Sequence, residues 1–119
     1  MNKREVGSEE EALAVRFLED RGCRILERNY RCSAGEIDIV FTDDQGRICF
    51  GEVKYRENAD KGLPEEAVDT RKQRIICRVS DHYRAENGMD ESLSYSFDVI
   101  AVTPAETRWI RNAFEYTGR

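Results

Sequence analysis

The stretch EIDIVFTDDQGRICFGEVKY, residues 36–55 of the 119-residue chain, carries the strongest structural signal in the sequence. Two runs rich in apolar and β-branched residues, 36–42 and 47–55, flank the polar segment Asp43-Asp44-Gln45-Gly46. This pattern predicts a β-hairpin in which Gly46 adopts the left-handed conformation at the end of a three-residue loop. Residues 42 and 48 then face each other, and this sets the register of the whole hairpin.

The predicted register brings charged residues together near one end of the hairpin. Side chains alternate between the two faces of a strand, so residues two apart share a face. Three facing pairs lie on the same face: Val40 with Phe50, Asp38 with Glu52, and Glu36 with Lys54. The opposite face is predicted to be a core face and carries Ile37, Ile39, Phe41, Cys49, Val53 and Tyr55.

Two interpretations of this charged cluster remain open from the residues alone. The first is a solvated hairpin face on which Lys54 balances Glu36. The second is a metal site, because like charges directly opposed across a hairpin destabilise it unless a cation bridges them. Mg²⁺ takes one or two carboxylates together with water and phosphate oxygens, and Lys54 would lie beside that pair. Apolar Val40 and Phe50 on the same face favour the second interpretation.

Two helices are predicted outside the hairpin. Apolar residues recur at helical spacing over residues 8–21 and 70–85. Ser8 and Thr70 are the expected N-caps, Thr70 forming a capping box with Gln73, and Gly22 and Asn87-Gly88 are expected to follow the helix ends.

Further strands are expected over residues 24–30 and 93–102, and residues 56–63 are expected to form a loop. Residues 108–114 fit either a strand or a helix. The resulting order predicts a single α/β domain spanning 1–119, with an ordered core of about 7–114, in which a central mixed sheet is flanked by helices.

Composition excludes several classes of protein. The net charge of −5 disfavours a protein that simply coats nucleic acid, although a nuclease site must itself be acidic. No apolar run approaches the ~20 residues of a membrane span, and the charged N-terminus carries no export signal. Four cysteines without a CxxC pair and one histidine, His82, make a zinc site improbable. We therefore expect a cytoplasmic protein with reduced thiols and no membrane contact.

Asp38 followed by Glu52-Val53-Lys54 resembles the PD-(D/E)xK motif of restriction-endonuclease-like nucleases. The surrounding segments 28–31, 35–40 and 50–56 resemble the bacterial YraN-like family, which is similar to archaeal Holliday-junction resolvases. The resemblance covers residues 7–114. It implies a restriction-endonuclease-like fold and Mg²⁺- or Mn²⁺-dependent cleavage of DNA, with branched DNA as one candidate substrate and a homodimer as one candidate assembly.

The resemblance assigns a role to each matching residue. The expected metal ligands are Asp38, Glu52 and, from the first helix, Glu11, and Lys54 is expected to position or activate the attacking water. The expected phosphate contacts are Arg28, Arg31, Arg56 and Lys72. One departure from the family pattern is Gly51, which is expected to weaken or bulge the strand beside Glu52.

Several of these residues have a competing local explanation. Glu11 also completes a capping box with Ser8, and Lys72 lies near an apolar stripe where lysines commonly snorkel. Arg28 and Arg31 are expected either to grip phosphates, with Tyr30 packed against a sugar or base, or to serve only the solubility of the surface. Asp98 is expected to be structural, and Trp109 is expected in the core or at an interface. For the whole protein, the alternative to a nuclease is a non-catalytic module that binds nucleic acid or protein.

Overall fold

The computed structural model describes residues 3–57 and 68–117, with side chains described from Glu9 onward in the first helix. Two helices and five strands follow one another along the chain, α1 (Lys3–Asp20), β1 (Arg24–Cys32), β2 (Gly35–Thr42), β3 (Ile48–Tyr55), α2 (Thr70–Glu86), β4 (Tyr95–Val102) and β5 (Thr107–Phe114). The predicted α/β class is therefore confirmed. Residues 58–63 of the predicted loop lie outside the described residues.

The five strands form one mixed sheet in sequence order, β1-β2-β3-β4-β5. The pairs β1–β2, β2–β3 and β4–β5 are antiparallel. β3 and β4 are parallel, from Ile48 opposite Tyr95 to Tyr55 opposite Val102. A parallel pair needs a crossover connection, and α2 lies in the one between these two strands.

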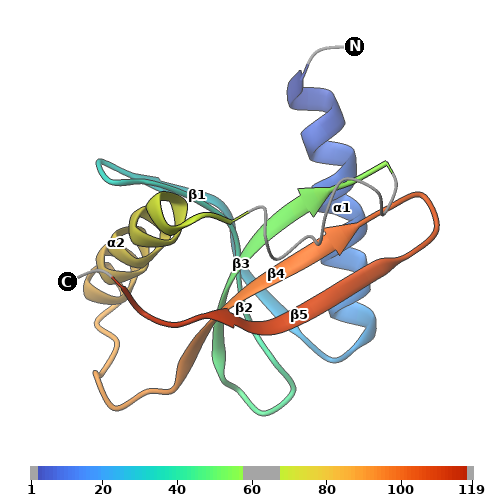
Figure 1. Ribbon diagram of the computed structural model, residues 1–119. Coiled ribbons are helices and arrows are strands. Elements are labelled where there is room, and N and C mark those ends of the chain that lie inside the picture. The colour runs from blue at the N-terminus through green and yellow to red at the C-terminus, as the bar shows by residue number, and fades with distance from the viewer. Residues whose placement is uncertain (1–2, 58–67, 118–119) are drawn as a thin grey trace.

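The two helices cover opposite faces of the sheet, and each face has its own core (Figure 1). Ala14 and Leu18 of α1 pack with Phe41 and Ile100 in one cluster. Ile76 and Val79 of α2 pack with the apolar side chains of the other face, among them Val40, Phe50 and Val99. The charged cluster predicted on the Val40 face therefore lies at the border of a core, not on an open wet face.

The predicted hairpin register is correct where the ladder forms. Ile39 faces Gly51 and Thr42 faces Ile48, and the loop 44–46 is closed by a hydrogen bond from Asp43 N to Arg47 O (3.0 Å). Gly46 has the predicted left-handed φ of 81°.

The ladder ends at Ile39 and Gly51, so two of the predicted facing pairs do not form. Asp38 does not become a ladder partner of Glu52, and Glu36 pairs instead with Arg31 of β1. Ile37 is likewise not on the Ile39 face, because it packs into the α2-side cluster.

Both predicted N-caps are wrong. α1 begins at Lys3, five residues before Ser8, so Ser8 lies inside the helix. The cap of α2 is Asp69, whose carboxylate accepts from Lys72 N (2.8 Å), while the Gln73 side chain donates to Val68 O. Asn87 is the C-cap of α2, as expected. The undecided segment near the C-terminus is the edge strand β5.

Gly51 does not bulge β3, because its pairing with β2 and with β4 is regular at this position. A Cβ atom on Gly51 would lie 3.0 Å from Ile100 Cδ1 and 3.1 Å from Phe41 Cε1. Gly51 therefore provides the space that the α1-side core needs.

Within the described ranges, no helix is both long enough and apolar enough to cross a lipid bilayer.

Candidate functional site

The sheet splits where the β2–β3 ladder ends. Beyond Ile39 and Gly51, β2 remains paired with β1, while β3 remains paired with β4 through Tyr55. The two arms diverge visibly in Figure 1, the β1–β2 arm toward α2 and β3 away from it. We call this point the fork and define it by Asp38 on β2 and by Glu52 and Val53 on β3.

Asp38 bridges the fork through its side chain. Its Oδ2 accepts a hydrogen bond from Val53 N at 2.8 Å, so the carboxylate replaces the backbone partner that β2 no longer provides. This bond fixes the carboxylate beside the next strand and satisfies a backbone donor that would otherwise be left unpaired. Sequence reasoning thus placed Asp38 near Glu52 correctly but missed the contact that holds it there.

Glu52 is the buried acid of the fork, with 6% of its surface exposed. Its Oε1 lies 3.9 Å from Lys72 Nζ, and its Oε2 is buried without a hydrogen-bond partner among the described residues. Burial raises the pKa of Glu52 to about 9, and the adjacent Asp38 carboxylate contributes both through a proton that the two acids can share and through its charge, against the lowering effect of Lys72 and Lys54. A buried carboxyl oxygen without a partner costs free energy, so the fork holds an acid that is costly to ionise in the metal-free protein.

Two lysines reach the fork from different elements. Lys54 is half-buried and lies two residues after Glu52, so the two side chains share a face of β3. Lys72 comes from the first turn of α2, on the β1–β2 arm. Lys72 Nζ lies 3.9 Å from the Glu52 carboxylate, so this side chain reaches the fork, and its contact with phosphate stays a prediction.

Glu11 approaches from α1 and does not act as a helix cap, because the helix begins upstream of it. Its Oε2 accepts from Asn29 Nδ2 at 3.2 Å and lies 3.8 Å from Arg28 Nη2. Burial raises the pKa of Glu11, and the charge of Asp38 adds to this effect. Glu11 therefore belongs to the acidic neighbourhood of the fork, but its polar contacts are to β1.

The donor set fits a hard divalent cation of the Mg²⁺ type. Two carboxylates, one of them with a buried unpartnered oxygen, match the ligand number that Mg²⁺ takes from protein, with water and phosphate oxygens completing its shell. In the part of the chain that the structure describes, no three or more acidic, histidine or cysteine side chains gather closely enough to hold a metal ion. Glu11 is thus not brought into a compact triad with Asp38 and Glu52.

The three arginines that the sequence assigns to phosphate contacts differ in environment. Arg28 pairs with Glu11, and Arg31 pairs with Glu36 at 3.1 Å while keeping 73% of its side chain exposed. Arg56 lies at the end of β3, where its backbone N–H donates to Val102 O.

Asn29, next to Arg28, has a left-handed φ of 54°, a conformation that asparagine tolerates better than most residues.

Three other sequence interpretations are resolved by packing. Tyr30 does not stack on a ligand, because its ring is buried against Tyr83 and its hydroxyl donates to Glu86. Asp98 is structural, as expected, since it accepts from Trp109 Nε1 (2.8 Å) and Asn112 N (3.1 Å). Trp109 packs against the α1-side core beside Phe41.

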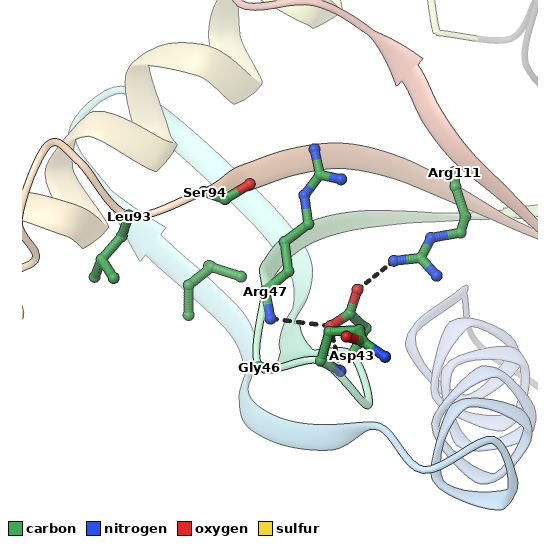
Figure 2. A pocket seen from close by; sticks show the side chains of 8 residues that line it. Asp43, Gly46, Arg47, Leu93, Ser94 and Arg111 are labelled. Atoms are coloured by element: carbon green, nitrogen blue, oxygen red, sulfur yellow. Dashed lines mark hydrogen bonds and ion pairs between the residues drawn. The ribbon is translucent and has the colours of Figure 1, made fainter.

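A pocket of about 570 Å³ lies at the opposite end of the hairpin, around its turn (Figure 2). Asp43 forms its buried wall and accepts from the backbone N–H groups of Gln45 and Arg47 and from the guanidinium of Arg111. The Arg47 side chain points away from Asp43 and donates to Tyr95 O and to the Asn112 side chain. These contacts fasten the turn to β4 and β5, and the sequence motifs did not indicate them.

Comparison with known proteins places this chain in a family. The uncharacterised protein family UPF0102 matches residues 10–102. A UPF0102 protein of Lachnoclostridium phytofermentans is 45% identical over 118 residues, 99% of each chain. A UPF0102 protein of Stutzerimonas stutzeri is 40% identical and covers 92% of this chain and 93% of its own, and one of Chlorobaculum parvum is 46% identical over 82% of this chain and 74% of its own. The chain therefore belongs to the uncharacterised protein family UPF0102.

Proposed function

We propose that this protein is a metal-dependent endonuclease that hydrolyses phosphodiester bonds in DNA. The observation that carries the proposal is Glu52, a buried carboxylate with an unpartnered oxygen, held beside Asp38 where the sheet splits. A fold selected only for stability gains nothing from this arrangement, because each acid raises the cost of ionising the other. A divalent cation would remove that cost.

The topology supports a restriction-endonuclease-like fold for this function. A β-hairpin carries Asp38 on one strand and Glu52-Val53-Lys54 on the other, and α2 then leads to a parallel fourth strand. The D…ExK residues Asp38, Glu52 and Lys54 therefore lie together at the fork. The superfamily assignment belongs to the proposal, together with the nuclease activity.

Each residue of the fork has a role in the proposal. Asp38 and Glu52 would hold Mg²⁺ or Mn²⁺, and the Val53 N–H keeps the Asp38 carboxylate in position. The bound cation would neutralise phosphate charge and lower the pKa of a water molecule. Lys54 orients the attacking water and offsets the charge that develops on the phosphate oxygens. Lys72, on the facing helix, shields Glu52 when the phosphate is absent and contacts that phosphate when it is present.

The surroundings of the fork fit a nucleic-acid substrate. Glu11 holds Arg28 and Asn29 on β1, next to the fork, and so acts as a positioning residue. Arg28, Arg31 and Arg56 contact phosphates on either side of the cleaved bond, as arginine does through its forked donors. A four-way junction would require two symmetric cuts, which a homodimer supplies.

The test is a cleavage assay with linear, flapped and four-way-junction DNA in Mg²⁺, in Mn²⁺ and in EDTA. Glu52→Gln keeps the shape of the side chain and removes its charge. Glu27→Gln, at an exposed position of β1, is the matched control. We expect cleavage in either metal, none in EDTA, a loss of at least 100-fold in Glu52→Gln and near wild-type activity in Glu27→Gln.

DNA that is bound but uncut in every metal would replace the proposal with a non-catalytic binding module. Cleavage that persists undiminished in Glu52→Gln would exclude the fork as the active site. Loss of activity in both variants would point to a general effect of charge, which would also contradict the proposed role of Glu52.

A further inference from the structure

The outer face of α2 carries three exposed arginines, Arg71, Arg74 and Arg78. Their spacing of three and then four residues places them on one side of the helix. The buried residues of α2 lie on the other side: Ile76, Cys77, Val79, Ser80 and Tyr83. We call the three residues the arginine stripe. It spans about 10 Å along the helix axis, given a rise of 1.5 Å per residue, and it points away from the sheet.

The arginine stripe has no acidic partner within the described residues. Arg28, Arg31, Arg84 and Arg111 each form an ion pair with a carboxylate, whereas no such pair includes a stripe arginine. The acids of α2 are engaged elsewhere. Asp69 caps the helix, Asp81 contacts Arg84 and Tyr116, and Glu86 accepts from Tyr30.

This arrangement costs stability in the isolated protein. Like charges three and four residues apart on a helix repel, and a cation in the first turn also opposes the helix macrodipole. The first turn itself carries no acidic residue, and the Asp69 carboxylate at the N-cap accepts from Lys72 N. Among the described residues no carboxylate pairs with this row of three arginines, and a negatively charged partner would remove the repulsion.

We infer that the arginine stripe docks the phosphate backbone of double-helical DNA outside the cleavage site. Arginine presents a planar fork of donors that matches a phosphate group, and an evenly spaced row suits a repeating polyanion better than a single anion. The inference rests on the proposed function, because Lys72, next to Arg71 in sequence, connects α2 to Glu52. A duplex held on the outer face would lie about one helix diameter, 10–12 Å, from the fork.

The stripe thus gives the protein a second contact with its substrate. One phosphate group enters the fork, while a neighbouring segment of duplex lies along α2. Such a contact selects for substrates that extend beyond the cleaved bond, and a junction or flap provides a second arm that could occupy it. Phosphate contacts of this kind position the protein and carry no sequence information themselves.

The test measures binding without cleavage, by fluorescence anisotropy with a labelled duplex and a labelled four-way junction in EDTA. The stripe variant carries Arg71→Gln, Arg74→Gln and Arg78→Gln. The matched control carries Arg16→Gln, Arg24→Gln and Arg108→Gln, three exposed arginines on α1, β1 and β5. Both variants lose the same charge, and circular dichroism melts establish that both fold.

We expect the stripe variant to lose at least tenfold in affinity at about 100 mM salt, and the control less than threefold. Each lost phosphate contact lowers the slope of log K against log salt by about 0.9, so the stripe variant should lose about two to three units of slope. A charge-reversed variant, Arg74→Glu, should weaken binding more than Arg74→Gln.

Equal losses in the stripe and control variants, or no DNA binding by the wild-type protein, would overturn the inference. The cleavage assay is read separately. Wild-type affinity in the stripe variant, with cleavage intact, overturns the docking surface and leaves the nuclease proposal standing. Stripe-dependent binding by a protein that never cuts supports the docking surface and overturns the nuclease proposal.

Discussion

The two ends of the β2–β3 hairpin each bury an acidic side chain, and the surroundings shift the pKa values of these two acids in opposite directions. Asp43 at the turn is 5% exposed, and Glu52 at the fork is 6% exposed. Burial raises the pKa of both groups. At Asp43, hydrogen bonds from Arg47 N, Arg111 and Gln45 N outweigh it and hold the pKa below its usual value. At Glu52, the neighbouring charge of Asp38 adds to burial, and the pKa is raised.

Equal burial therefore has different consequences at the two ends. Asp43 is matched by donors that hold its charge, so it stabilises the fold. Glu52 lacks enough hydrogen-bond donors to hold its charge, so it lowers the stability of the fold. Such a costly acid is typical of a functional site. The difference lies in the partners and not in the exposed fraction. Burial is nearly equal at Asp43 and Glu52, whereas their pKa values are shifted in opposite directions.

The largest expected effect is the loss of stability when Asp43, at the turn of the hairpin, is replaced. Asp43→Ala removes two hydrogen bonds to backbone N–H groups and leaves Arg111 without its carboxylate. We expect the free energy of unfolding to fall by about 3 kcal/mol, as measured by urea denaturation. Asp44→Ala, at the exposed next position, should change it by less than about 0.5 kcal/mol. Similar losses of stability in Asp43→Ala and Asp44→Ala would mean that the Asp43 carboxylate does not stabilise the fold, and the contrast with Glu52 would disappear.

The hairpin could be predicted because its determinants are local. Gly46 and the polar turn set the loop, the loop sets the register, and the register places Asp38 and Glu52 at the same end. The fork could not be predicted, since it depends on β2 following β1 and β3 following β4. The Ile37 side chain shows the consequence, because it leaves the face that alternation assigns to it and packs on the α2 side.

Local rules also failed where a distant contact or an upstream turn decided the outcome. Ser8 has the chemistry of an N-cap, yet α1 begins at Lys3. Glu11 therefore bonds Asn29, eighteen residues away in sequence, instead of its own helix end. The segment 108–114 had no decisive period, and its strand conformation follows from pairing with β4. Long-range pairing of this kind leaves little trace in a single sequence.

The second prediction concerns metal binding at the fork. A cation that binds the folded state raises stability by mass action, and at ten times its Kd the gain is about 1.4 kcal/mol. We expect Mg²⁺ to raise the melting temperature of the wild-type protein, but not that of Glu52→Gln or Asp38→Asn. Asp43→Asn, at the turn of the hairpin, should retain the Mg²⁺-induced rise in melting temperature. A rise of equal size in Glu52→Gln would place the metal elsewhere.

Replacing Glu52 should stabilise the protein, whereas replacing Asp43 should destabilise it. In EDTA, Glu52→Gln keeps the size of the side chain and removes an acid that costs the folded protein stability at pH 7. Because the pKa of Glu52 is raised to about 9, the side chain must take up a proton when the chain folds at pH 7, where the unfolded chain has it ionised. We expect the free energy of unfolding to increase by about 1 kcal/mol, because glutamine does not carry this cost. Urea denaturation of the two proteins at pH 7 is the measurement. A decrease would mean that the Glu52 carboxylate is well compensated, like Asp43.

The smallest expected effect concerns the lysine that partly compensates Glu52. Lys72 Nζ lies 3.9 Å from the Glu52 carboxylate, but 41% of the Lys72 side chain is exposed, so solvent screens the pair. In EDTA at about pH 9, where Glu52 is ionised in part, Lys72→Met keeps the apolar stem and should lower the free energy of unfolding by about 0.2–0.5 kcal/mol. In the Glu52→Gln background the same change should have no effect, so a double-mutant cycle isolates the pair. An equal loss in both backgrounds would show that Lys72 acts through packing, and the compensation of Glu52 would then rest on Lys54.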